Sequence, residues 1–248
     1  MQAKLHFSRF EFKYILPQHL RDELEKEFQY FVELDPYTAG KPGGKYFVRS
    51  LYYDNAAFRN YYEKVDGMKH RAKFRLRTYT GEEGDGTPQF LEIKGRYNNL
   101  VFKHRAHVAP GKTEVDPSPY DHPTTRAILG GLEEGPIKNQ FRFELARKGL
   151  KPVMLVDYWR RPFVSKYDPE FRMTMDDTVS GTVCDTLFPG PNAHRKLTLP
   201  GYTILEVKFR FHMPKWFHRL VQSYELRRVS ISKVCAAIDV HGLAEKLD

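Results

Sequence analysis

The sequence predicts an α+β fold, rich in β-strands, in which about eight strands carry one charged and one apolar face and helices lie at both ends of the chain. The strongest observation is the stretch Lys69–Arg77, in which every odd position is a lysine or an arginine and Ala72, Phe74 and Leu76 fall between them. Because a strand points successive side chains to opposite faces, one face of this strand is wholly cationic. The same alternation recurs along the chain, so the pattern describes a whole sheet.

The predicted strands are the segments in which charged and apolar residues alternate. These segments are 7–16, 45–53, 69–77, 89–96, 100–108, 139–147, 152–160, 170–177 and 203–211. Stretches rich in proline, glycine or asparagine separate many of them and are expected to be loops, at 35–44, 81–88, 109–123 and 180–202.

Apolar residues at helical spacing predict amphipathic helices near the two ends of the chain. Pro17 suits a first helical turn, and Leu20, Leu24 and Phe28 then recur every fourth residue, so a helix is expected over 18–32. No linker divides the sequence convincingly, and a single domain is therefore expected over the whole chain. The predicted helices are 18–32, 56–64, 124–129, 214–228 and 232–247.

Composition indicates a basic protein with an anionic partner. Lysine and arginine number 40 against 31 aspartates and glutamates, which gives a net charge of +9. Nucleic acid, a membrane surface or phosphorylated small molecules would fit this charge. The only cysteines, Cys184 and Cys235, match no zinc-ligand spacing, so we expect a reducing, cytoplasmic environment. The sequence shows neither a signal peptide nor an apolar run of about 20 residues, so no membrane segment is expected.

The charged strand faces have two interpretations. In an ordinary antiparallel sheet they would face water, with the apolar side on a helical core. These faces, however, consist mostly of Arg, Lys and Glu, which favours a sheet that closes on itself and encloses a charged bore. A basic bore suits a chain of phosphates. Glu11, Glu92 and Glu206 would either pair with neighbouring bases or hold a divalent cation there.

Short motifs along nearly the whole chain resemble those of the VTC domain. This is the polyphosphate polymerase domain of the vacuolar transporter chaperone complex, a branch of the triphosphate tunnel metalloenzymes. Each motif alone is weak, but eight of them in the expected order are a strong signal. The motifs are RFEFKYIL near the start, SLYYDN (50–55), KFRLRTY (73–79), LEIKGR (91–96), DYWRRPF (157–163), FRMTMDD (171–177), ILEVKF (204–209) and SK (232–233).

The resemblance implies a closed eight-stranded antiparallel barrel, the triphosphate tunnel, with a charged interior and flanking helices. It also implies transfer of the γ-phosphoryl group of ATP onto inorganic polyphosphate with Mn²⁺ or Mg²⁺. Glu206 would be the carboxylate that holds the metal, and Ser232 a further contact at the tunnel mouth. By matching positions, the phosphate-binding bases would be Lys13, Arg75, Arg77, Lys94, Arg160, Arg172, Lys208 and Lys233.

Phosphoryl transfer needs alignment and charge neutralisation more than covalent help from the protein. An arginine guanidinium can bind two phosphate oxygens at once, so Arg75, Arg77 and Arg172 are expected catalytic residues. Lys208 is the fourth expected catalytic residue and would act as a point charge. Glu206 would hold the metal together with Glu11 and Asp176. We expect ATP and polyphosphate as partners and no nucleic acid.

The first strand departs from the wider superfamily. Other members carry Glu-x-Glu-x-Lys there, whereas this chain reads Arg9, Glu11, Lys13. The change favours the polymerase branch over a hydrolase of the same superfamily that splits triphosphate. An inactive polyphosphate- or nucleotide-binding domain stays open as a further alternative. Coupling to membrane translocation would need a separate membrane-protein partner.

Overall fold

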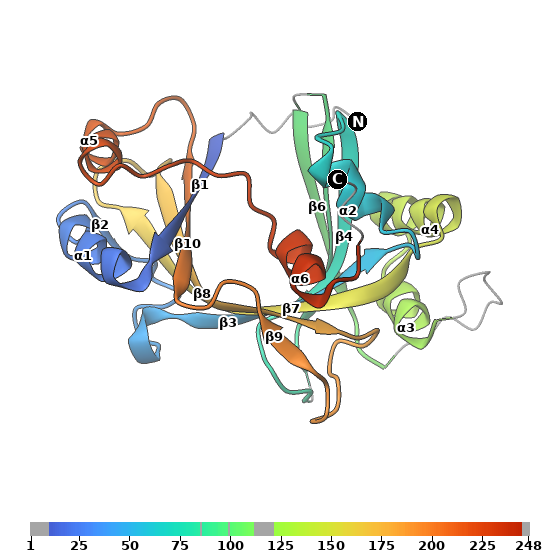
Figure 1. Cartoon of the computed structure of the whole chain (residues 1–248). Coiled ribbons are helices and arrows are strands. Elements are labelled where there is room, and N and C mark those ends of the chain that lie inside the picture. Colours follow the sequence, from blue (N-terminus) through green and yellow to red (C-terminus); the bar gives the residue numbers. More distant parts are fainter. Residues whose placement is uncertain (1–9, 85, 99, 112–121, 245–248) are drawn as a thin grey trace. The chain divides into compact units, whose positions relative to one another are not determined.

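The computed structural model describes residues 10–84, 86–98, 100–111 and 122–244. These residues form an α+β fold with ten strands and six α-helices (Figure 1). The strands are β1 (Phe10–Pro17), β2 (Val32–Leu34), β3 (Tyr46–Asp54), β4 (His70–Thr78), β5 (Gln89–Tyr97), β6 (Leu100–Val108), β7 (Lys151–Ser165), β8 (Arg172–Val183), β9 (Arg195–Leu197) and β10 (Tyr202–Phe209). The helices are α1 (Gln18–Phe28), α2 (Arg59–Val65), α3 (Pro123–Gly131), α4 (Pro136–Lys148), α5 (Lys215–Ser223) and α6 (Lys233–His241), with a 3₁₀ turn at Pro42–Gly44.

The chain divides into two compact units, each built from separate stretches of sequence. Unit 1 comprises 1–47, 158–179 and 198–232, and unit 2 comprises 48–157, 180–197 and 233–248. Strands β3, β7 and β8 contribute residues to both units, because the unit boundaries fall within them. A single domain over residues 1–248 stays a prediction.

All strand pairs with a described register are antiparallel, as expected. The strand order is β1-β10-β8-β7-β3-β4-β5-β6, with β2 beside β7 and β9 beside β8. This order has two ends, β1 and β6, and no pairing in the described part of the chain joins them. The predicted closed barrel is therefore not supported. Alternation predicts which face a side chain takes, but it is the same in an open and a closed sheet, so it could not determine closure.

Each unit has its own apolar core. In unit 2, Phe74, Leu76, Leu91 and Ile93 from β4 and β5 pack with residues of α3 and α4. These are the residues that alternate with bases in the sequence, and each fully buried side chain of this size stabilises the fold by about 1.5–3 kcal/mol.

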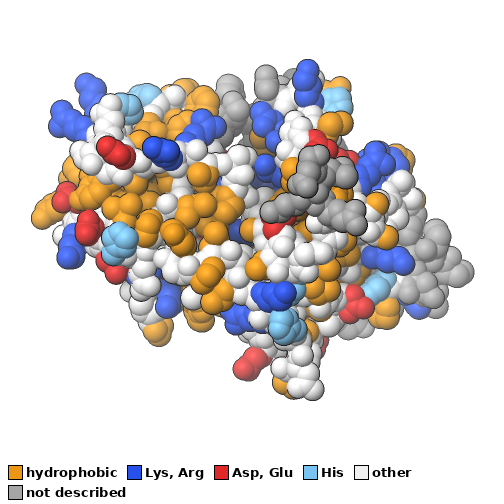
Figure 2. All heavy atoms as spheres, in the orientation of Figure 1, with side chains coloured by type: hydrophobic (Ala, Val, Ile, Leu, Met, Phe, Trp, Pro, Cys, Tyr) orange, Lys and Arg blue, Asp and Glu red, His pale blue; other side chains and the backbone are white. Residues whose placement is uncertain are grey.

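In unit 1, β1, β8 and β10 pack their apolar faces against α1 and α5. Phe217 of α5 is fully buried, and its ring stacks on that of Phe28 from α1 at 6.1 Å. Exposed apolar side chains also occur in this unit, with Phe211 72% exposed. Figure 2 shows apolar side chains gathered over the part of one face that α1 and α5 occupy in Figure 1.

The predicted strand at 139–147 is wrong, because these residues lie in helix α4. Pro136 starts this helix at its first turn, and Gly149 ends it in the left-handed conformation with φ 63°. Phe141 and Leu145, one turn apart, point into the core, whereas Phe143 is 60% exposed. Over residues 139–147, Arg142 and Glu144 alternate with apolar residues, and over so few residues this pattern cannot be told from that of a strand. The predicted loop at 180–202 likewise contains the end of β8 and the strand β9.

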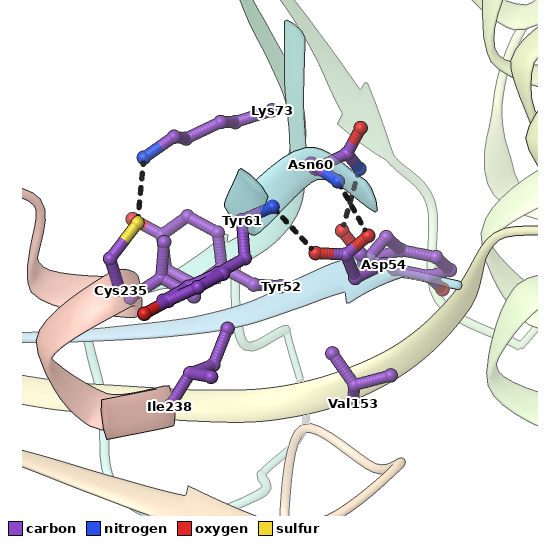
Figure 3. Close-up of a pocket in the computed structure, with 10 residues that line it drawn as sticks. Tyr52, Asp54, Asn60, Tyr61, Lys73, Val153, Cys235 and Ile238 are labelled. Atoms are coloured by element: carbon purple, nitrogen blue, oxygen red, sulfur yellow. Dashed lines mark hydrogen bonds between the residues drawn. The ribbon is translucent and has the colours of Figure 1, made fainter. Parts of the chain in front are cut away.

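A small pocket of unit 2 lies where α6 meets β3 and α2 (Figure 3). Cys235 from the first turn of α6 accepts a contact of 3.8 Å from the Nζ of Lys73. The ring of Tyr61 lines the same pocket, and its hydroxyl donates a hydrogen bond of 2.5 Å to Asp239. These contacts fix α6 onto the sheet of unit 2.

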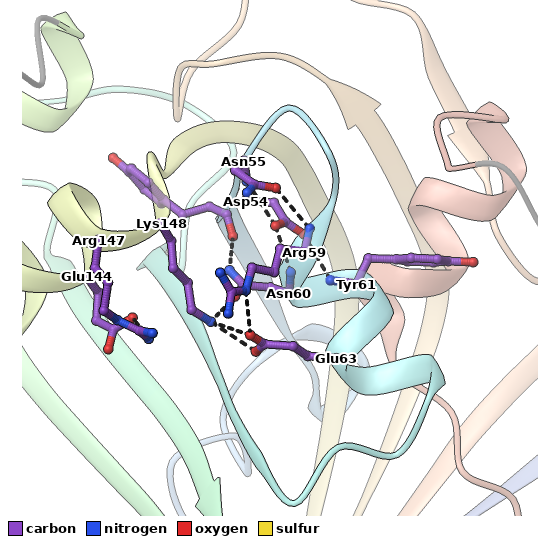
Figure 4. Close-up of polar contacts among 10 residues, drawn as sticks. Asp54, Asn55, Arg59, Asn60, Tyr61, Glu63, Glu144, Arg147 and Lys148 are labelled. Carbon is purple, nitrogen blue, oxygen red and sulfur yellow. Dashed lines mark hydrogen bonds and ion pairs between the residues drawn. The ribbon is translucent and has the colours of Figure 1, made fainter.

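Asp54 organises the turn from β3 into α2 (Figure 4). Its Oδ1 accepts hydrogen bonds from the backbone amides of Asn55 and Asn60 at 2.9 and 2.8 Å, and its Oδ2 accepts one from Tyr61 at 3.0 Å. Lys148 of α4 donates to the Oδ1 of Asn60 at 2.8 Å. The buried carboxylate thus satisfies amides at the start of a helix that has no side-chain N-cap of its own.

Replacing Asp54 by alanine is expected to destabilise the protein by about 2 kcal/mol or more, because buried amide groups lose their acceptors. Urea unfolding measures the change. Asp66→Ala, at an exposed position at the other end of α2, should change stability by no more than about 0.5 kcal/mol. Equal effects of the two substitutions would contradict this structural role of Asp54.

Gly95 allows β5 and β6 to pack closely. It lies opposite Ala72 on one side and Phe102 on the other, and a Cβ at this position would meet the Phe102 ring at 2.0 Å. The aromatic ring therefore covers the space that a side chain would take.

Gly95→Ala is expected to destabilise the protein by about 1–3 kcal/mol, since the Phe102 ring must move out of a packed position. Gly190→Ala in the same unit is a matched control, because no atom lies within 4 Å of its added Cβ. Thermal or urea unfolding compares the two. A Gly95→Ala variant as stable as the control would show that the contact with Phe102 is not restrictive.

Candidate functional site

Unit 2 contains a cationic face built by β4, β5 and β6 around one carboxylate, Glu92. The side chain of Glu92 is 1% exposed. Arg75 donates to its Oε2 through Nε at 2.8 Å and Nη2 at 2.6 Å, and Arg77 lies 3.4 Å from the same oxygen. Lys103 and Arg105 approach the other oxygen at 2.9 and 3.9 Å. Register explains the cluster, because Arg75, Glu92 and Arg105 lie directly opposite one another on the three strands.

The charge state of Glu92 follows from this arrangement. Burial raises its pKa, but the positive charges of Arg75, Arg77 and Lys103 outweigh burial and hold the pKa well below its usual range. The ionised carboxylate holds the Arg75 guanidinium through two charge-assisted hydrogen bonds to one oxygen. Burial lowers the pKa of Lys103, and the attraction of Glu92 opposes this effect only in part.

Strand β3 adds two hydroxyl groups to this cluster. The phenol oxygen of Tyr52 accepts a hydrogen bond of 2.7 Å from Nη1 of Arg75, and Ser50 accepts one of 3.2 Å from Nε of Arg77. Burial raises the pKa of Tyr52, but Arg75, Arg77 and Lys73 outweigh it and lower the pKa to about 8. Tyr52 is thus a polar contact of the candidate site in unit 2.

Tyr52 and Ser50 were not predicted as site residues from the sequence. Both lie in the SLYYDN motif, but they looked like ordinary residues of a predicted strand. The available signal was their position: they alternate with Leu51 and Tyr53, which are core residues, and so share one face of the strand. Which strand lies beside that face is decided by the pairing of β3 with β4, where Ser50 faces Arg77 and Tyr52 faces Arg75.

Unit 1 contains a second cluster, formed by β1 and β10. Lys13 lies 3.2 Å from Glu11 and 3.7 Å from Glu206, and Lys208 lies 2.7 Å from Glu206. Burial opposes the charge of Lys13, but the two glutamates outweigh burial and raise its pKa. Arg172 of β8 lies opposite Lys208 in the register and is exposed.

Arg160 and Asp176 form a bidentate pair in unit 1. Nε and Nη2 of Arg160 donate to the two carboxylate oxygens of Asp176 at 2.6 and 2.7 Å, and Asp176 is fully buried. Burial disfavours the charge on Arg160, but Asp176 raises its pKa well above the usual value. Arg161, the next residue, instead pairs with Glu25 at 2.5 Å. Neighbouring residues of a strand point to opposite faces of the sheet, which accounts for these different partners.

The structure thus sorts the expected site residues into two groups. Those in unit 1 are Glu11, Lys13, Arg160, Arg172, Asp176, Glu206, Lys208 and Ser232, and those in unit 2 are Arg75, Arg77, Lys94 and Lys233. Lys94 is an exposed residue of β5, and Lys233 begins α6. Arg9, whose departure from the superfamily pattern is noted above, lies outside the described residues. The roles of all these residues stay predictions.

A metal site would have to use few protein ligands. Among the described residues, no three His, Cys, Asp or Glu side chains come close enough together to hold a metal ion. Glu11 and Glu206 are the two carboxylates that approach the same atom, the Nζ of Lys13. Mg²⁺ commonly uses one or two carboxylates together with phosphate oxygens, so this pair fits such an ion. Asp176 would first have to release an oxygen from Arg160.

In the native protein, tyrosinate ultraviolet absorbance is expected to rise near pH 8 as Tyr52 ionises. The folded-state pKa lies below the ordinary value of 10.0, so ionisation of Tyr52 adds stability above that value, and this stability is lost as pH falls through 8. Tyr52→Phe should remove the component near pH 8, while Tyr167→Phe, at a position that is 75% exposed, should leave it unchanged. Persistence of the component in Tyr52→Phe would refute the lowered pKa.

Comparisons with known proteins agree with the family expected from the motifs. The VTC domain family matches residues 8–241. None of the curated protein sequences matches the chain. Within the described helices, none combines the length and apolar character that crossing a membrane requires.

Solved structures include one with a similar fold. A Bacillus halodurans protein described as a candidate adenylate cyclase has a TM-score of 0.51 and 9% sequence identity, covering 91% of this chain and 94% of its own. A Pyrococcus horikoshii OT3 protein gives a TM-score of 0.38 at 14% identity, covering 88% and 86%. At 9% identity, the similarity to the Bacillus halodurans protein is evidence about the fold alone.

Proposed function

Because the chain belongs to the VTC domain family, we propose that it transfers the γ-phosphoryl group of ATP onto inorganic polyphosphate. The observation that supports this most is the basic cluster of unit 2, in which four cations share the buried carboxylate of Glu92. Family membership supports a function related to nucleotides or phosphates, and the polymerase reaction is the specific proposal.

The unit 2 cluster suits a phosphate chain because its cations greatly outnumber its acids. The bases Arg75, Arg77, Lys103 and Arg105 share the single carboxylate of Glu92. Four positive charges around one negative charge leave a strong positive field, and such a field attracts polyanions. Lys94 on the same face of β5 extends this field along the strand.

In the proposed reaction, the protein binds and orients the phosphates. Arg75 is held by Glu92 on one side and Tyr52 on the other, so its guanidinium is oriented before the substrate arrives. Orientation in advance lowers the barrier, because the group need not reorganise during phosphoryl transfer. The terminal phosphate of the acceptor chain is already an anionic nucleophile, so no general base is required.

In unit 1, Lys13, Lys208 and Arg172 would bind further phosphate oxygens as charges on neighbouring strands. Ser232 of unit 1 and Lys233 of unit 2 are the remaining proposed phosphate contacts. Arg160, held by Asp176, would supply a fixed positive charge.

Mn²⁺ or Mg²⁺ is the proposed cofactor, with Glu206 and Glu11 as the residues that would hold it. When bound, the ion would neutralise phosphate charge. The role of the protein is to present the two carboxylates, which Lys13 and Lys208 hold in place through ion pairs. Because the protein supplies few ligands, substrate phosphates are expected to strengthen metal binding.

The proposal is tested by incubating the purified protein with ATP and Mn²⁺ and separating the products on a gel. Long polyphosphate is expected, and Glu206→Ala and Arg75→Ala are each expected to reduce its formation by about 100-fold or more. Arg75→Ala would remove a positive charge that contacts the transferring group, and Glu206→Ala would remove a carboxylate that holds the metal. Circular dichroism checks that the variants stay folded.

Matched controls come from exposed positions on helices of unit 1. Glu27→Ala on α1 and Arg219→Ala on α5 remove the same charges and should leave synthesis unchanged. Release of free phosphate without long chains would instead identify a triphosphate hydrolase. Tight binding of polyphosphate without turnover would identify an inactive binding domain. Either result would overturn the polymerase proposal.

A further inference from the structure

The β4–β6 face of unit 2 continues beyond the Glu92 cluster as two rows of opposed bases, here called the outer rows. In the first, Lys73 of β4 lies opposite Lys94 of β5, which lies opposite Lys103 of β6, a base that also reaches Glu92. In the second, Arg71 lies opposite Arg96. Neither row contains a carboxylate at a described register position.

This arrangement is unfavourable for the protein alone. Side chains directly opposite one another on neighbouring strands lie about 4.5–5.5 Å apart at Cβ, and like charges in such positions repel. Burial lowers the pKa of Arg71, and the positive charge of Arg96 lowers it further. A sheet face selected for stability alone would mix acids into these rows, as the adjacent row does with Glu92.

The outer rows are accessible and partly held in place. Lys94, Arg96 and Lys103 are exposed. Nε of Arg96 donates to the carbonyl oxygen of Asn98 at 2.8 Å, and Arg71 donates to that of Met68. Backbone carbonyls thus limit the conformations of these two long side chains, which lowers the entropy lost when a ligand binds.

The rows also follow one another in a line. Arg71, Lys73 and Arg75 are two residues apart on β4, and two residues of a strand advance by about 6.5–7 Å. From the Arg75–Glu92 row to the Arg71–Arg96 row, the face therefore extends about 13–14 Å. A ligand that covers it must be a linear polyanion longer than the few phosphates that the Glu92 cluster can contact.

A polyanion that lacks nucleobases, such as polyphosphate, fits this face better than a single-stranded nucleic acid. Surfaces that bind single-stranded nucleic acid place aromatic side chains among the Lys and Arg side chains, so that nucleobases stack on the aromatic rings. Next to the outer rows, the aromatic pair is His70 and Tyr97, stacked at 4.2 Å. These two residues occupy the register position adjacent to Arg71 and Arg96, and so point to the opposite face of the sheet.

We propose that the outer rows bind the part of a polyphosphate chain that extends beyond the Glu92 cluster, and thereby select long chains over triphosphate. This proposal rests on the phosphate-chain binding proposed above and adds to it the residues that set chain-length preference. Arg71 and Arg96, which lie outside the Glu92 cluster, are the positions assigned to this selection.

The test compares the affinities of inorganic triphosphate and long-chain polyphosphate for the full chain and for Arg71→Gln/Arg96→Gln. The double substitution is expected to weaken long-chain binding by about tenfold or more, because charge-assisted contacts are lost. Triphosphate binding should change by less than about twofold, since the Glu92 cluster is intact. The salt dependence of long-chain binding should also become less steep, since fewer phosphates are neutralised.

Controls separate this proposal from the general effect of charge. Lys26→Gln/Lys151→Gln removes two exposed positive charges outside the outer rows and should leave the preference for long chains intact. Arg96→Gln alone, which also leaves the Glu92 cluster intact, is a second variant that tests the second row if the double variant does not fold. Circular dichroism verifies folding of each variant.

The possible outcomes are distinct. Equal loss of triphosphate and long-chain binding in the double variant would overturn the selection proposal while leaving phosphate binding at the Glu92 cluster. Failure of the unsubstituted protein to bind either polyanion would overturn the proposed function and this proposal with it. Single-stranded RNA that binds more tightly than polyphosphate, and loses its binding in the double variant, would assign the outer rows to nucleic acid instead.

Discussion

The electrostatic constraint at Glu92 governs the charged face of unit 2. Four cations on β4 and β6 approach one carboxylate that is almost excluded from solvent, and that carboxylate keeps the bases at fixed positions. Without Glu92, Arg75 and Arg105 would lie on the same face with no negative charge between them to offset their repulsion. A buried ion cluster of this kind contributes little net stability, because the cost of removing charges from water offsets their attraction. What the cluster provides is a fixed arrangement of donors.

The same principle applies on a smaller scale in unit 1. Glu206 and Glu11 surround Lys13, and Asp176 holds Arg160 through two hydrogen bonds. In each case an acid fixes a base that would otherwise sample many conformations. Binding of phosphates to fixed bases costs less entropy than binding to mobile ones. The acids of both clusters can therefore serve phosphate recognition even where they do not hold a metal.

The two faces of the sheet differ in role: the apolar face supplies stability, and the charged face carries the proposed phosphate contacts. Phe74 and Leu76 are buried in the core of unit 2, while Arg75 between them faces the opposite side. Stability therefore comes from the apolar side, which leaves the other side able to carry opposed like charges. This division explains why the rows at Lys73 and Arg71 can persist with no acid at their own register positions, since the repulsion is small compared with the burial of the apolar residues.

The sequence by itself determined which side chains share a face. In Lys69–Arg77, successive side chains of the strand point to opposite faces, which separates Arg75 and Arg77 from Phe74 and Leu76. This alternation depends only on the local backbone, and the structure confirms it. The VTC motifs also identified the family over nearly the whole chain. Local patterns sufficed for both.

Only the tertiary structure decided how the strands pair and what lies beside each base. The pattern at 139–147 suits a strand as well as a helix over so few residues, and burial of Phe141 and Leu145 selected the helix. The neighbours of Tyr52 and the open ends of the sheet follow from pairing between segments distant in sequence. Such pairing depends on the packing of whole strands, which no single stretch of sequence contains.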